Sequence, residues 1–148
     1  MPIKSFRGLI PDGGIDIVSL KTNDGSTGYR ITKLKGISNN PGFAMGEHVV
    51  KIYKIPQDVS TVDGVIDLSD NTLIACLYFT NRTDTLHSNE SMIIAENEIF
   101  NQDIYITHSD VQGTEAGNYY IELEQINLAL DQNTVATLKD IRNITGHE

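Results

Sequence analysis

Residues 71–81, Asn-Thr-Leu-Ile-Ala-Cys-Leu-Tyr-Phe-Thr-Asn, are the longest mostly apolar run in the chain and constrain its fold more than any other stretch. In an extended strand the apolar residues fall on both faces, with Leu77 and Phe79 on one face and Cys76 on the other. A strand that is apolar on both faces is covered on both, so we expect this run at the centre of the core. A helix is the alternative, but the Thr-Asn flanks and the adjacent aromatic residues favour a strand.

Further runs of strand-forming residues, separated by turn residues, predict a β-rich chain. The expected strands cover residues 15–20, 29–37, 47–55, 65–68 and 118–130, with shorter apolar pieces at 92–95 and within 97–107. Lys33 and Lys35 interrupt the alternation of their strand, which indicates a β-bulge or a partly exposed strand end. Asp24-Gly25 lies between two apolar runs and predicts a hairpin that joins them.

One segment near the end of the chain changes to a helical period. Residues 131–143 place Val135 and Leu138 on one face, and Asp131 suits the N-cap position. We therefore expect an all-β fold: a single antiparallel β-sandwich or barrel with one short C-terminal helix. At 148 residues the whole chain, 1–148, is expected to form one domain.

The net charge of −9 is unevenly distributed along the chain. Residues 1–54 carry a net charge of +4 and residues 55–148 a net charge of −13. A chain this acidic is repelled by phosphate backbones, so we expect no nucleic-acid partner. The uneven distribution has two interpretations. It can reflect two differently charged solvated surfaces, or a basic N-terminal third that contacts an acidic partner such as a neighbouring copy of the chain.

Other features of the composition exclude several classes of protein. No run of about 18 apolar residues is present, so we expect no transmembrane helix and no membrane partner. The N-terminus lacks the apolar core of a secretory signal. A single cysteine cannot form an internal disulfide, and we interpret Cys76 as a small buried hydrophobe.

No residue pattern identifies a reaction or a metal site. The four histidines lack metal-ligand spacing and are expected at the surface where they fall in strands and loops: His48, His87, His108 and His147. The aspartates of residues 58–70 do not match a calcium loop, and we interpret them as solvated carboxylates. Glu122 and Glu124 share a strand face, as a glycoside hydrolase could use, but no cleft aromatics accompany them. We expect no catalytic residue, no metal and no cofactor, hence no enzyme.

The N-terminal segment is the candidate partner-binding site. Residues 2–10 are predicted to form an arm or a short edge strand whose apolar anchors alternate with cations. This arrangement suits a segment that docks on a partner surface. The candidate partner-binding residues are Ile3, Lys4, Phe6, Arg7 and Leu9.

Several stretches together resemble a family of small virion proteins of tailed phages that infect marine bacteria. The stretches are residues 4–9, 25–31, 49–54, 67–73, 97–105, 118–124 and 134–139. The resemblance runs over nearly the whole chain, and its motifs are structural rather than catalytic. It implies a virion structural protein that decorates and stabilises the capsid. The implied partners are the major capsid protein and other copies of the chain. The implied location is the outer capsid surface, after synthesis in the host cytoplasm.

Three other functions remain open at this stage. A tail or head–tail connector component would be a ring-forming structural protein. A carbohydrate-binding module for host attachment would need exposed aromatic residues, and the candidates are Phe43, Tyr78, Tyr119 and Tyr120. A hydrolase is the least favoured function, because no convergent catalytic residues are visible.

Overall fold

The computed structural model describes residues 2–22, 25–42, 46–80, 90–95 and 98–128. Within these ranges the chain forms strands and one 3₁₀ turn. They are β1 (Ile3–Ile10), β2 (Ile15–Val18), β3 (Thr27–Ser38), β4 (Glu47–Tyr53), η1 (Val59–Thr61), β5 (Leu73–Thr80), β6 (Glu90–Ile94), β7 (Ile104–Asp110) and β8 (Gly117–Asn127). The expected C-terminal helix, residues 131–143, lies outside the described residues.

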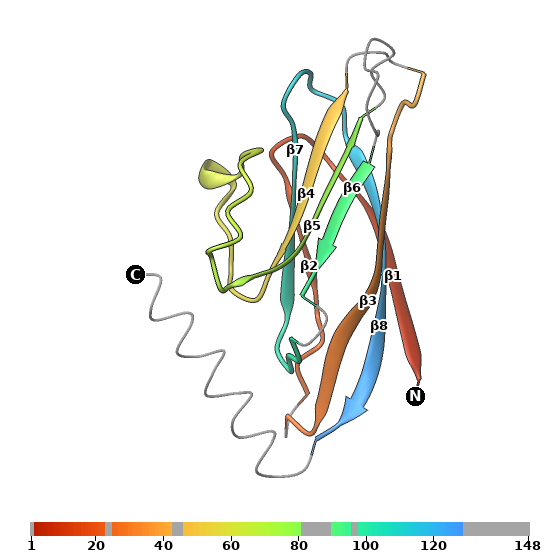
Figure 1. Ribbon diagram of the computed structural model, residues 1–148, viewed down its shortest axis with the longest axis vertical. Helices are drawn as coiled ribbons and strands as arrows, with labels where there is room; N and C mark the ends of the chain where they lie inside the picture. Colours follow the sequence, from red (N-terminus) through yellow and green to blue (C-terminus); the bar gives the residue numbers. More distant parts are fainter. Residues whose placement is uncertain (1, 23–24, 43–45, 81–89, 96–97, 129–148) are drawn as a thin grey trace.

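The strands build two antiparallel sheets that pack face to face, which confirms the predicted all-β sandwich. The three-stranded sheet has the order β1-β8-β3, and the five-stranded sheet has the order β2-β7-β4-β5-β6. Figure 1 shows the two sheets with β1, β3 and β8 on one side and β2, β7, β4, β5 and β6 on the other. Their inner faces bury one continuous apolar core.

The apolar run at residues 71–81 forms β5, and its burial confirms the predicted core position. Leu77 is fully buried and Phe79 is 6% exposed. β5 lies between β4 and β6, next to the central strand of the five-stranded sheet. Gly36 of β3 faces it across the sandwich: a Cβ atom there would lie 2.5 Å from the Phe79 ring. On the outer face Cys76 is buried as expected, and burial raises the pKa of its thiol.

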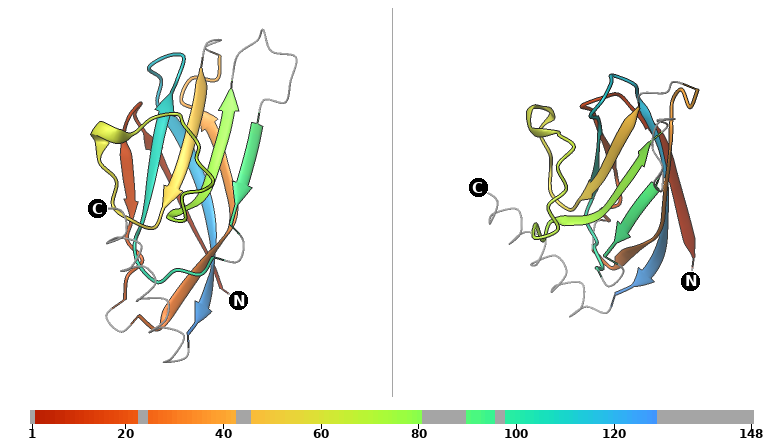
Figure 2. Two further views of the ribbon diagram at one scale, coloured as in Figure 1. Left: turned by 60° about the vertical axis from the view of Figure 1, so that its left-hand side comes forward. Right: turned by 45° about the horizontal axis from the view of Figure 1, so that its top comes forward.

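A long loop after β4 covers the outside of the five-stranded sheet (Figure 2). Lys51 of β4 is 4% exposed, and its Nζ donates to Asp63 Oδ1 at 3.0 Å and to the Val65 carbonyl oxygen at 2.7 Å. Residues 65–68 were predicted to form a strand, and this prediction is wrong. The Val65 N–H donates to the Asp63 carboxylate, so neither backbone group of Val65 is available for a ladder.

The β-bulge predicted in β3 is present. The register of β3 against β8 shifts between Ile31 and Lys33. The extra residue reverses the alternation, so Leu34 is fully buried while Ile37 is 57% exposed. An unshifted strand would have placed Ile37 on the same face as the buried Ile31.

The predicted hairpin at Asp24-Gly25 is wrong, although a turn residue is present. Gly25 has a φ of +66°, which suits a tight turn. The two flanking strands do not pair with each other: β2 pairs with β7, and β3 pairs with β8. The connection therefore crosses from one sheet to the other. Near the start of β3, Tyr29 forms an isolated antiparallel β-bridge with Phe100, where the predicted hairpin would have placed β2.

We predict that Phe79→Ala lowers the free energy of unfolding by roughly 3–5 kcal/mol, because truncating a buried ring leaves a cavity. Urea denaturation at pH 7 measures this loss. Ile17→Ala is the matched control, since Ile17 is 56% exposed on β2 and its truncation should cost little. Similar losses for both variants would contradict the assignment of Phe79 to the core.

Candidate functional site

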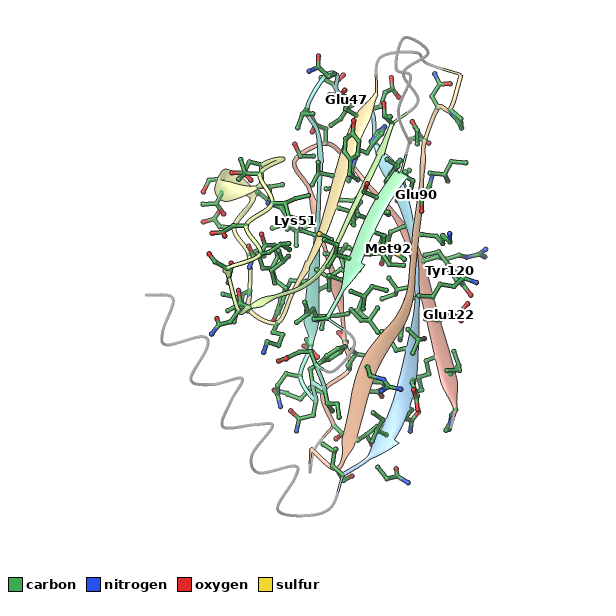
Figure 3. The ribbon with its side chains drawn as sticks, in the orientation of Figure 1. Glu47, Lys51, Glu90, Met92, Tyr120 and Glu122 are labelled. Atoms are coloured by element: carbon green, nitrogen blue, oxygen red, sulfur yellow. The ribbon has the colours of Figure 1, made fainter. Side chains whose placement is uncertain are left out.

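The outer face of the three-stranded sheet is the most distinctive exposed surface of the described chain. In β8, Tyr119, Ile121 and Leu123 are buried against the core, whereas the alternate residues point away from it. Figure 3 shows Tyr120 and Glu122 projecting away from the five-stranded sheet. No part of the described chain covers this face, so its outward side chains are available to a partner.

A groove of about 590 Å³ lies at one end of this face. Its outward side chains come from all three strands in matched rows. One row is Arg7–Tyr120–Lys35, and the next is Leu9–Asn118–Ile37. Two cations therefore flank a tyrosine, and two aliphatic side chains flank an asparagine. Leu9 and Ile37, on either side of Asn118, are 52% and 57% exposed, so this row presents apolar surface to a partner.

Cross-strand ion pairs neutralise the other end of the face. The Arg30 guanidinium pairs with Glu124, and Lys33 Nζ lies 3.7 Å from Glu122 Oε2. At the groove end the Tyr120 hydroxyl donates to Glu122, and this hydrogen bond raises the pKa of the phenol. Positive charge is thus concentrated near the groove.

The uneven charge of the chain is partly resolved within the fold. The ion pairs of the described residues each join a cation from the first 54 residues to a carboxylate from later in the chain. They are Arg30–Glu124, Lys33–Glu122, Lys35–Glu90, Lys51–Asp63 and Lys54–Glu98. Arg7 forms no ion pair with the described residues, so its charge remains available in the groove.

The N-terminal segment is an edge strand, one of the two forms that the sequence predicts. β1 pairs with β8 along its whole length, from Ile3↔Glu124 to Ile10↔Gly117. Phe6 packs against the core, and Lys4 Nζ lies 5.9 Å from the centroid of the Tyr29 ring. The remaining candidate residues share the outer face with the groove. They are Ile3, Arg7 and Leu9. The segment therefore contributes to its own sheet, and docking on a partner stays a prediction.

One row of backbone hydrogen-bonding groups of β1 meets no partner strand among the described residues. The Gln125 N–H donates to the Pro2 carbonyl oxygen, so Pro2 and Gln125 form a hydrogen-bonded pair. Such pairs alternate along an antiparallel ladder. The backbone groups of Ile3, Ser5, Arg7 and Leu9 therefore point to the outer edge of the sheet, where the described chain places no strand.

The structure separates the aromatic residues that the sequence nominated for glycan binding. Tyr120 lines the groove, whereas Tyr119 is buried and its hydroxyl donates to Asp16. Burial, together with that carboxylate, raises the pKa of Tyr119. Tyr78 is half-buried in β5, and Phe43 lies outside the described residues.

Sequence reasoning missed the groove residues of β3 and the asparagine of β8. Lys35 was interpreted as an interruption of the alternation, and Ile37 as part of an ordinary strand. The sequence did not show at which residue the bulge reverses which side chains face outward. Asn118 was treated only as a strand start. The alternation within residues 118–124 was the available signal, since Tyr119, Ile121 and Leu123 share one strand face and Tyr120 lies on the other.

Two histidines expected at the surface are fully buried, and the expectation is wrong for both. His48 lies in β4, and His108 lies in β7. His48 Nδ1 lies 2.8 Å from His108 Nε2, and the His48 ring stacks on Phe79 at 4.8 Å between centroids. Gly117 allows this arrangement, because a Cβ atom there would lie 2.6 Å from His108 Nε2.

Hydrogen bonding assigns the protons of the histidine pair. His108 Nδ1 lies 3.2 Å from the Pro11 carbonyl oxygen, which can only accept, so Nδ1 carries a proton. In the neutral ring Nε2 is then an acceptor, and His48 Nδ1 donates to it. Burial lowers the pKa of both imidazoles, and for His48 the neighbouring His108 lowers it further.

The carboxylate beside the pair organises a turn. Burial alone would raise the pKa of Asp110. Hydrogen bonds from the N–H groups of Glu47, Glu115 and Gln112 outweigh burial and lower it. The cluster is enclosed at one end of the sandwich and does not border the groove, so we assign it to stability. Within the described residues no group of three or more His, Cys, Asp or Glu could hold a metal ion.

Comparison with known proteins adds no family assignment. No family model matches the chain, and a search of curated proteins finds no match. The described helical structure includes no segment long and apolar enough to cross a membrane.

We predict that the protein loses stability as pH falls below about 6.5, the ordinary pKa of histidine. The folded state keeps His48 and His108 neutral, whereas the unfolded chain binds protons in this range, so acidification favours unfolding. Urea denaturation from pH 7.5 to 5 measures the change. Carboxylates whose pKa is lowered affect stability only near and below the usual carboxyl pKa of 3.8. They are Asp58, Asp63, Asp67 and Asp110.

The imidazole ¹⁵N shifts provide the check that is specific to the pair. They should show neutral rings protonated at Nδ1 in both residues at pH 7. A stability that stays constant or rises from pH 7 to 5, or a protonated imidazolium at pH 7, would contradict this assignment.

Proposed function

We propose that this chain is a structural protein of a tailed-phage virion, and that it decorates the capsid by binding the outer face of the major capsid protein. The observation that carries the proposal is the outer edge of β1, where no strand of the described chain pairs with a row of backbone groups beside exposed Ile3 and Leu9. The resemblance of the sequence to small virion proteins supports the same role. The proposal assigns no reaction and no cofactor.

The β1 edge carries the charged residues Lys4 and Arg7 but lacks several other features by which proteins usually protect sheet edges. It is eight residues long, pairs with β8 without a register shift, and has no proline inside the strand. A partner segment could add as a further strand, with backbone hydrogen bonds supplying affinity and side chains such as Ile3 and Leu9 supplying specificity. Modest contacts would suffice on a capsid, because many symmetric copies bind the same shell.

A tail or connector component is the alternative structural role. In that case the same edge would bind the neighbouring subunit of a ring rather than the shell. The number of copies per particle distinguishes the two roles, since a shell protein is present in proportion to the major capsid protein.

A carbohydrate-binding module is the second candidate function, favoured by one observation. Tyr120 lies between Arg7 and Lys35 in the groove, with Asn118 in the next row. An aromatic face with nearby polar groups can bind a sugar. Glycan-array binding that is lost in Tyr120→Ala would favour this function over decoration.

We predict that Ser5→Pro prevents incorporation into virions while the protein still folds. The Ser5 N–H points to the open edge, so proline removes a group that a partner strand would use and leaves the ladder to β8 intact. Ser5→Ala is the matched control. Mass spectrometry of purified particles gives the stoichiometry against the major capsid protein, and we expect at least a tenfold loss for Ser5→Pro alone.

Circular dichroism and thermal melting establish that both Ser5 variants are folded. Equal incorporation of the two variants would refute docking through the β1 edge. Absence of the wild-type protein from the particles would refute the virion role itself.

A further inference from the structure

The loop between β4 and β5 presents a second unusual surface, on the opposite side of the sandwich from the groove. We define the loop surface as Val59, Val65, Leu68 and the aspartates around them. The three aliphatic side chains are 64%, 67% and 62% exposed, which is high for apolar residues so close together in sequence. Figure 1 shows this loop beyond β4 and β7, away from β1, β3 and β8.

The loop surface is fixed to the five-stranded sheet beneath it, so its exposed apolar residues belong to an ordered loop. The buried Lys51 ammonium binds the loop at Asp63 and at the Val65 carbonyl. Four aspartates each accept a hydrogen bond from the N–H two residues later, which fixes successive turns: Asp58, Asp63, Asp67 and Asp70. A partner would therefore meet a surface that needs little ordering.

The groove and the loop surface are complementary in charge. The outer face of the three-stranded sheet carries the cations Arg7, Arg30, Lys33 and Lys35. Glu124, Glu122 and, from β6, Glu90 pair with the last three, which leaves a net charge of +1 within a chain of net charge −9. The loop, residues 56–70, contains four aspartates and no cation, and among the described residues Lys51 is the one cation that forms an ion pair with it. Each surface also offers exposed aliphatic side chains.

We propose that the loop surface of one copy docks in the groove of the next copy. The aliphatic side chains of the loop would contact Leu9 and Ile37, and the aspartates would face Arg7 and Lys35. Because the two surfaces differ and lie on opposite sides of the molecule, the contact is head-to-tail and produces rings or open chains rather than a closed two-fold dimer. The inference deepens the proposed function by assigning the groove to a neighbouring copy, while the β1 edge remains for the shell.

The test uses the purified full chain in sedimentation velocity at rising concentration. The groove variant is Arg7→Glu with Lys35→Glu. The loop variant is Val65→Lys with Leu68→Lys, which leaves the turn-forming aspartates unchanged. Lys21→Glu is the matched charge control, because Lys21 is exposed and lies on neither surface. Thermal melting shows whether each variant is folded.

The wild type and Lys21→Glu should form larger species as concentration rises, and about 0.5 M NaCl should weaken them. Each double variant alone should stay monomeric, because like charges then face each other. An equimolar mixture of the two should associate into one-to-one dimers, because the native loop of the groove variant can dock in the native groove of the loop variant. A wild type that stays monomeric at millimolar concentration would overturn the proposal. Variants that assemble alone, or a mixture that fails to recover, would overturn it too.

The outcome is separable from the test of the capsid role. Ser5→Pro should retain self-association while losing incorporation into virions. If the groove and loop variants lose self-association but single copies still bind the shell, the proposed function stands on its own. If the wild type assembles but is absent from particles, the head-to-tail contact stands and the capsid role fails.

Discussion

The pairing of β8 between β1 and β3 is the interaction on which the rest of the structure depends. One strand from the acidic later part of the chain is hydrogen-bonded on both sides to strands from the basic N-terminal part. Its inward residues, such as Ile121 and Leu123, are fully buried in the shared core. Its outward residues form the ion pairs to Arg30 and Lys33. Partly exposed ion pairs contribute little to stability, so apolar burial holds the sheet and the charges favour this pairing over others.

The same pairing determines what remains available for binding. Because β8 has both edges occupied, β1 is left with one open edge, and its outward side chains join those of β3 in the groove. Carboxylates of β8 neutralise one end of the face. At the other end Lys35 pairs with Glu90 of β6, and Arg7 forms no ion pair with the described residues. The opposite sheet has its outer face covered by a loop that Lys51 tethers. The two proposed contacts, at the β1 edge and in the groove, therefore follow from one topological arrangement.

Local patterns in the sequence were sufficient to predict much of the fold. The apolar run of β5 identified the core, and the interrupted alternation of β3 indicated a bulge. Strand pairing was not predictable, because it depends on contacts between residues far apart in the chain. The Asp24-Gly25 signal thus gave a turn but the wrong partner for β3. The histidine pair was missed for the same reason: 60 residues separate His48 and His108, and only the fold brings together the acceptor and donor that make burial tolerable.

The most direct test of this account is amide hydrogen exchange along β1 in the free protein, followed residue by residue by NMR. The account predicts alternation: slow exchange at Lys4, Phe6 and Gly8, whose amides bond to β8, and fast exchange at Ile3, Ser5, Arg7 and Leu9, whose amides point to the open edge. Uniformly fast exchange would show that the segment does not belong to its own sheet. Uniformly slow exchange in the dilute protein would show that the edge is already covered and would contradict its availability to a partner.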